Sequence, residues 1–184
     1  MNRFTGLVVG AVVAPTLAIS GGLERSELPT SFLYEDGNYL EVTYINRNFE
    51  ITDNMFAPSR SMLDDVSAVN FATKFDAGEN LSVGLARYNQ AGASHNYQGA
   101  GSPIPGFSAV GPKTDLSINA LTLMGRYAFD DFSAIGGIKI STVADATADI
   151  FKLSGATTAA SVTGGSDTGL VAGVAYERPE IALR

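Results

Sequence analysis

The stretch from Asp115 to Ile150 constrains the fold more than any other part of the chain, because it has the pattern of two long β-strands joined by a very short turn. Both arms alternate between two faces with a period of two residues, which excludes a helix. Each arm runs to roughly 15 residues, well beyond an average globular strand and long enough to cross a membrane at a tilt. The stretch therefore predicts a β-hairpin in an all-β protein, either a transmembrane antiparallel β-barrel or a large soluble sandwich or lipocalin-like barrel.

The two faces of this hairpin differ in composition. The apolar face holds Leu121, Leu123, Gly125, Tyr127 and Phe129 on the first arm and Phe132, Ala134, Gly136, Ile138 and Ile140 on the second. The mixed face holds Ala120, Thr122, Met124 and Arg126 on the first arm and Ser133, Ile135, Gly137, Lys139 and Ser141 on the second. Such a hairpin has one apolar side and one mixed side.

Residues 1–20 have the layout of a secretory signal peptide, with a basic residue at Arg3, an apolar core from Gly6 to Ala14 and a small-residue end after Pro15. Ala18 and Ser20 match a cleavage site that makes Gly21 the first mature residue. A membrane anchor is the alternative, but the run is too short to span a bilayer as a helix. No later stretch approaches the ~18 apolar residues of a membrane helix, so any crossing of a bilayer must be made by strands.

Composition removes several classes of function. The chain has 184 residues, no Cys, one His and a net charge of −7. Without Cys an exported chain has no disulfides, thiolate nucleophiles or cysteine ligands for zinc. The acidity argues against a nucleic-acid partner, which needs cationic residues to neutralise phosphates.

The mature chain alternates strands with connections of two lengths. The expected strands are Asn38 to Ile51, Asp65 to Phe75, Asn80 to Gln90, Asp115 to Phe129, Asp131 to Ile150, Ser166 to Glu177, and a seventh that begins at Ile181. Short turns are expected at 76–79, 130–131 and 178–180, and long loops at 52–64, 91–114 and 151–165. Bacterial outer-membrane barrels keep this alternation, with short periplasmic turns and long extracellular loops. The pattern favours an exported outer-membrane barrel over a soluble sandwich.

Several of these strands are apolar or small on both faces, which is unusual for a water-filled porin. The clearest cases are Asp65 to Phe75 and Ser166 to Glu177. A lumen lined in this way would hold an apolar guest better than water. The alternative is that the small inward residues let packing or a plug fill the interior.

Three segments carry a family resemblance: GGLERSELPTSFLYEDGNYLEVTY (21–44), TDLSINALTLMGRYAFDDFSAIGGIKI (114–140) and GLVAGVAYERPEIALR (169–184). Together they resemble the N-terminal half of FadL-type transporters of the bacterial outer membrane. The resemblance implies a barrel of about fourteen strands, of which six to seven are present here, an N-terminal plug, and passive uptake of hydrophobic molecules such as long-chain fatty acids or aromatic hydrocarbons. It divides the chain into a signal peptide (1–20), a short plug-like segment (21–37) and the N-terminal part of a barrel (38–184). The Asn-Pro-Ala plug motif of well-known family members has no counterpart.

No catalytic constellation is expected. Asp167-Thr168-Gly169 spells the triplet of aspartic proteases, but their chemistry needs two copies that share a proton, and one copy is present. His95 lies in a Gly/Ser/Asn-rich stretch without an obvious acidic partner and is interpreted as a solvated loop residue. The chain is therefore expected not to be an enzyme and to need no metal or cofactor.

The candidate ligand contacts are mostly apolar. Ile104, Phe107 and Val110 cluster in the loop 91–114, where exposed apolar residues need a reason. They either pack over the barrel mouth or form a first docking groove for a hydrophobic substrate, which Met55 and Phe56 of the first long loop would join. Inside the lumen, Met124 and Arg126 could offer an apolar surface and a charge to a carboxylate headgroup, unless Arg126 only ends its strand in water near the rim.

The function that these observations favour is an outer-membrane channel for passive uptake of hydrophobic molecules. Its expected partners are those molecules, outer-membrane lipid and lipopolysaccharide. A structural or adhesin-like barrel and a soluble lipid carrier are the alternatives. The sequence also predicts an incomplete barrel, because six strands enclose too narrow an interior for a ligand and would leave open edges in lipid.

Overall fold

The fold is all-β. The structure, a computed structural model, describes residues 25–50, 61–98, 112–151 and 158–177, which form a single antiparallel sheet and one short 3-10 helix. The elements are η1 (Ser31–Tyr34), β1 (Tyr39–Arg47), β2 (Val66–Asp76), β3 (Leu81–Asn96), β4 (Lys113–Phe129), β5 (Phe132–Val143), β6 (Ala146–Phe151), β7 (Thr158–Val162) and β8 (Gly165–Tyr176). Within these residues no helix has the length and hydrophobicity of a membrane-spanning helix.

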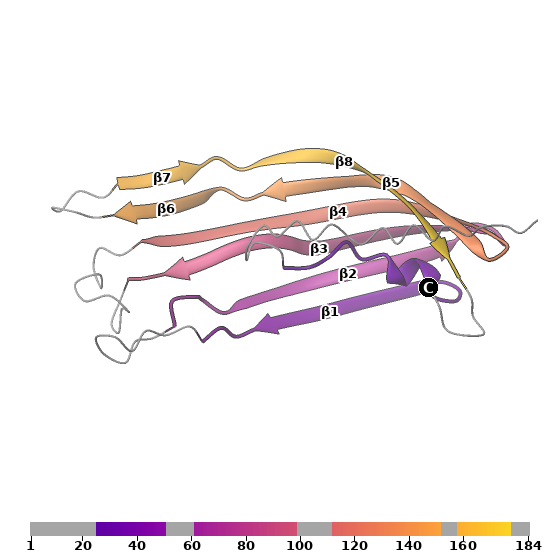
Figure 1. Cartoon of the computed structure of the whole chain (residues 1–184), viewed down its shortest axis with the longest axis horizontal. Helices are drawn as coiled ribbons and strands as arrows, with labels where there is room; N and C mark the ends of the chain where they lie inside the picture. Colours follow the sequence, from indigo (N-terminus) through magenta and orange to yellow (C-terminus); the bar gives the residue numbers. More distant parts are fainter. Residues whose placement is uncertain (1–24, 51–60, 99–111, 152–157, 178–184) are drawn as a thin grey trace, which may run out of the picture.

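Six strands lie side by side in the order β1-β2-β3-β4-β5-β8, each antiparallel to its neighbours (Figure 1). β6 pairs with the beginning of β4 and with β7, so that β6 and β7 extend the sheet at the end where the long connections lie. The described sheet is not closed. Within it β1 pairs with β2 alone and β8 pairs with β5 alone, so each has a free edge.

The hairpin that the sequence predicts between 115 and 150 is present. β4 and β5 pair from Ile118↔Val143 to Phe129↔Phe132, which leaves Asp130 and Asp131 as a two-residue turn. Asp130 has a φ of 50°, a left-handed conformation that Asp adopts more readily than most residues. The short connection between β2 and β3 is also as expected, with Asp76 paired to Ser82.

The longer connections differ from the expectation. The expected loop 91–114 contains strand at both of its ends, because β3 continues to Asn96 and β4 starts at Lys113. The small and polar residues of 91–96 have weak strand propensity, but their backbones pair with those of 113–118. The expected strand Asp131 to Ile150 ends at Val143, and β6 begins after a break in which Asp145 Oδ1 accepts a hydrogen bond from the Gly164 backbone N–H at 2.6 Å. β7 lies within the expected loop 151–165.

The two faces of the six-stranded region differ strongly in exposure. Large exposed apolar side chains lie on one face, here called the outward face, while most of the residues between them are half-buried or buried. The outward face includes Leu40, Val42, Tyr44, Val69, Phe75, Leu81, Leu121, Leu123, Tyr127, Phe129, Phe132, Ile138, Ile140, Leu170, Val174 and Tyr176. The two faces predicted for the central hairpin are confirmed.

The opposite, inward face is covered by the N-terminal segment 25–36. Phe32 and Leu33 of η1 are buried, and they form the core of the protein with Ala72, Ala86 and Met124 of β2, β3 and β4. This core is small, and polar side chains such as Lys74, Thr122 and Ser133 are buried on the same face. The inward face therefore buries a small apolar core together with several polar side chains, while most large apolar side chains of the sheet lie exposed on the outward face.

Candidate functional site

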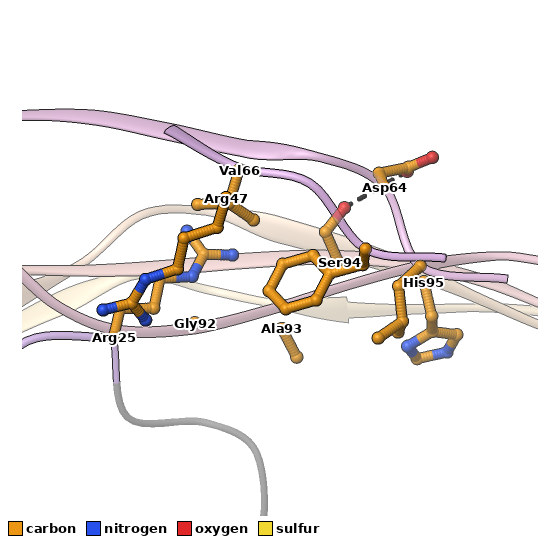
Figure 2. A pocket seen from close by; sticks show the side chains of 10 residues that line it. Arg25, Arg47, Asp64, Val66, Gly92, Ala93, Ser94 and His95 are labelled. Carbon is orange, nitrogen blue, oxygen red and sulfur yellow. Dashed lines mark hydrogen bonds between the residues drawn. The ribbon is translucent and has the colours of Figure 1, made fainter. Parts of the chain in front are cut away.

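A pocket of about 280 Å³ opens on the inward side, near the end of the sheet where the long connections lie. The N-terminal segment, the end of β1, the start of β2 and the second half of β3 contribute to it (Figure 2). It is lined by Arg25, Arg47, Phe49, Leu63, Asp64, Val66, Gly92, Ala93, Ser94 and His95.

Two arginines from distant parts of the chain meet in this pocket. Arg47 ends β1, where it pairs with Val66. Arg25 is held against β3 by its backbone N–H, which donates to the Gln90 carbonyl at 2.9 Å, and by its guanidinium Nη1, which donates to Asn89 Oδ1 at 3.3 Å. Figure 2 shows the two guanidinium groups near one another. The pocket therefore brings two cations together, with the carboxylate of Asp64 also in its lining.

Burial lowers the pKa of Arg25, and the charge of Arg47 adds to this effect while Asp115 opposes it. A guanidinium nevertheless keeps its proton at any physiological pH. Arg25 is therefore a cation in a partly desolvated site, with Asp115 as a nearby counter-charge. An arginine can also bind a negatively charged ligand, and a carboxylate fits its planar donor geometry.

The rest of the lining is mainly apolar and is held in place by hydrogen bonds. The Phe49 backbone N–H donates to Asp65 Oδ1 at 3.1 Å, and Ser94 Oγ donates to Asp64 Oδ2 at 3.2 Å. Leu63 forms an isolated antiparallel bridge with His95. Two cations beside Phe49, Leu63 and Val66 suit a ligand with an acidic head and an apolar tail.

His95 differs from the sequence interpretation. It lies in β3 and is half-buried, with its ring 5.9 Å from the ring of Tyr97 in an edge-to-face arrangement. Among the described residues no group of three or more His, Asp or Glu side chains is arranged to hold a metal ion.

Met124 and Arg126, the lumenal candidates, lie at the other end of the inward face. Met124 is 1% exposed and packs in the core with Phe32 and Leu33. Arg126 forms an ion pair with Glu177, and its Cζ lies 4.6 Å from the centre of the Tyr34 ring. Met124 is covered by η1, and Arg126 contacts both Tyr34 of η1 and Glu177, which follows β8. Their contact with a headgroup therefore stays a prediction that requires η1 to move.

The five loop candidates, Ile104, Phe107, Val110, Met55 and Phe56, lie outside the described residues. Sequence reasoning missed Arg25, Arg47 and the apolar residues around them. The sequence pattern could have indicated Arg47, since alternation along β1 places it on the same face as Tyr39, Glu41 and Thr43. No sequence pattern indicates Arg25 as a pocket residue, because its position depends on how the N-terminal segment crosses β3.

Comparisons with protein-family models, with curated proteins and with solved structures found no match to this chain.

Proposed function

We propose that this chain forms part of an outer-membrane β-barrel that lets hydrophobic molecules with an acidic group, such as long-chain fatty acids, pass by diffusion. The observation that carries the proposal is the inverted polarity of the sheet. A soluble barrel or sandwich buries its apolar face, whereas the wall of a membrane barrel turns that face to lipid.

The outward apolar band has a sharp limit on each of the six adjacent strands. Towards the long connections, every run of outward apolar residues ends at a polar one. These polar residues are Asn46 on β1, Ser67 on β2, Arg87 on β3, Asn119 on β4, Thr142 on β5 and Thr168 on β8. On β5 the apolar run from Phe132 to Ile140 has about nine residues, which matches the length of a tilted strand across a bilayer.

The other limit of the band is rich in aromatic residues. Next to the short turn between β4 and β5, Phe129 and Phe132 stack with ring centres 6.1 Å apart, and Phe132 lies 5.0 Å from Tyr176. Tyr127 and Phe75 are exposed on the same face. Aromatic girdles of this kind mark the membrane–water interfaces of outer-membrane barrels. Because the turns of such barrels are short on the periplasmic side, this girdle would lie at the periplasmic interface.

The pocket supplies the argument for an acidic, hydrophobic solute. It lies on the inward side, which becomes the lumen in a barrel, and it combines Arg25 and Arg47 with apolar walls. Arg25 belongs to the N-terminal segment, so that segment would contribute to solute binding as well as filling the lumen. No group in the described residues suggests chemistry on the solute, and passage by diffusion needs none.

Uptake into proteoliposomes that contain the complete barrel, of which this chain is a part, tests the proposal with a labelled fatty acid and an uncharged hydrocarbon of equal chain length. Arg25→Gln and Arg47→Gln should each raise the half-saturating fatty-acid concentration about tenfold, since one hydrogen bond to a charged group contributes roughly 1.5–3 kcal/mol. Hydrocarbon uptake should not change. Lys113→Gln is the matched control, because Lys113 is exposed on β4 and does not line the pocket.

Cell fractionation, together with the uptake assay, separates the alternatives. A protein that fractionates with outer membranes but transports neither solute would indicate a structural or adhesin-like barrel. A protein recovered in the soluble periplasmic fraction with bound lipid would indicate a carrier.

A further inference from the structure

A second cavity, of about 270 Å³, lies between β3, β4 and β5 and is separate from the lumenal pocket. Arg87, Asn119 and Thr142 contribute its polar groups, and Leu121 and Ile140 contribute apolar walls. These five residues form two adjacent rows across the sheet, since Arg87 pairs with Leu121, Leu121 with Ile140, and Asn119 with Thr142. Leu121 and Ile140 are outward residues, so the cavity opens on the outward face.

Arg87 is the unusual member of this group. It is exposed on the outward face, between the buried side chains of Ala86 and Tyr88, and follows the apolar outward residues Val83 and Leu85. Within the described residues its side chain forms no ion pair or hydrogen bond, whereas Lys74 and Arg126 each have an acidic partner. An arginine at the centre of a lipid-facing surface is strongly destabilising, and the penalty becomes small close to the membrane interface.

The polar neighbours of Arg87 are hydrogen-bond donors. Asn119 Oδ1 is occupied by Asn89 Nδ2 at 3.3 Å, which leaves the Asn119 Nδ2 group to donate. Thr142 Oγ1 shares a hydrogen bond of 3.0 Å with Ser166 Oγ and keeps further capacity. No carboxylate lines the cavity. The donor set selects a compact anion, and the apolar walls continue towards the hydrocarbon of the bilayer.

We propose that this cavity binds the phosphate headgroup of a phosphorylated glycolipid, the lipopolysaccharide class of the outer leaflet. Arg87 and Asn119 hold the phosphate oxygens, Thr142 donates from the side, and an acyl chain lies along Leu121 and Ile140. The position of the cavity agrees with this assignment. The cavity lies at the end of the outward apolar band that is nearer to the long connections. In an outer-membrane barrel the long connections are on the side of the outer leaflet.

This inference rests on the proposed function, since only a protein inserted in the outer membrane meets that lipid. The test uses the complete barrel that contains this chain, extracted from outer membranes in mild detergent. Bound glycolipid is counted by native mass spectrometry, and affinity is measured by titration with purified diphosphorylated lipid A. Arg87→Gln should weaken binding about tenfold or more, and Thr142→Val by a smaller factor. Arg87→Lys should retain part of the affinity, because it keeps the charge but loses the planar donor pair.

Three controls fix the interpretation. Lys113→Gln should bind lipid A as the unaltered protein does. Inorganic phosphate at the same concentration should not compete, because it lacks the acyl chain that contacts Leu121 and Ile140. Arg47→Gln should leave lipid A binding unchanged, since Arg47 lines the lumenal pocket and not this cavity.

The outcomes distinguish this inference from the proposed function. Recovery of the protein outside the outer membrane would overturn both. If the protein is in the outer membrane and Arg87→Gln binds lipid A with unchanged affinity, the headgroup site is wrong and the transport proposal stands. Equal competition by inorganic phosphate would mean a general anion site and would also overturn it.

Discussion

A Cβ atom added to Gly84 would lie 2.5 Å from Cδ2 of Leu33, so η1 reaches the sheet only because residue 84 has no side chain. The same Cβ would lie 2.5 Å from Cε2 of Phe32. Phe32 and Leu33 are the largest apolar groups in the core, which means that docking of the whole N-terminal segment depends on this contact.

Gly84→Val should therefore displace η1 from the inward face, at a cost of about 1–3 kcal/mol for an overpacked site. Residues 25–36 should become accessible to proteases and should exchange amide hydrogens faster, while the strands stay protected. Gly136→Val is the matched control, because a Cβ at Gly136 has no atom within 4 Å. Equal protection of 25–36 in both variants would contradict the role of this contact.

The second prediction concerns Arg126 and Glu177. Their side chains are 15% and 20% exposed, so the ion pair is largely desolvated and removal of one partner leaves a buried charge. A double-mutant cycle with Arg126→Gln and Glu177→Gln should give a coupling of about 1–3 kcal/mol in the free energy of unfolding.

The same variants test Arg126 as a headgroup ligand. If Arg126 contacts a carboxylate solute after η1 moves, Arg126→Gln should weaken fatty-acid binding, whereas Glu177→Gln should strengthen it by freeing the guanidinium. Equal affinities in both variants would restrict Arg126 to its structural contacts with Tyr34 and Glu177.

The central hairpin was predictable because its evidence is local: alternation along 115–141 assigns each side chain to a face, and two aspartates between aromatic residues mark the turn. The strand in 91–96 was not predictable from the sequence, since its small polar residues pair through backbone groups with a segment that is distant in sequence. The pocket was missed for a related reason. Arg25 and Arg47 are 22 positions apart, and only the path of the N-terminal segment over β3 brings them together.

A charge placed within the outward band should hinder membrane assembly, and the same charge beyond the band should not. Val174 and Thr168 provide a matched pair, because both are outward residues of β8 and only Val174 lies within the apolar run. Val174→Lys should reduce the amount of assembled protein in outer membranes, with a cost of about 2–4 kcal/mol near the midplane. Thr168→Lys should cost about 0–1 kcal/mol. Similar losses for both variants would argue against a lipid-facing band.

The orientation of the barrel in the outer membrane can be determined by labelling single introduced cysteines, since the chain has no cysteine of its own. Single cysteines at Ser59 and Ser102, in the long connections, should react with an impermeant thiol reagent on intact cells. A cysteine at Ala77, in the short turn between β2 and β3, should react only after the outer membrane is opened. Labelling of Ala77 alone on intact cells would reverse the proposed orientation.

The last prediction follows from the free edges of β1 and β8. Each edge exposes backbone N–H and C=O groups along a strand, and in a bilayer every unpaired group costs several kcal/mol. The six adjacent strands alternate in direction, so β1 and β8 run antiparallel. A further strand that pairs with the edge of β1 leaves the backbone groups of the β8 edge unpaired, unless the sheet closes into a barrel. We therefore expect both edges to recruit further strands. Expressed as these 184 residues alone, the chain should form oligomers or aggregates in detergent and should not migrate as a heat-modifiable monomer. A heat-modifiable, protease-resistant monomer would mean that β1 and β8 close on each other in a small barrel, which would leave less room in the lumen than a fatty acid needs.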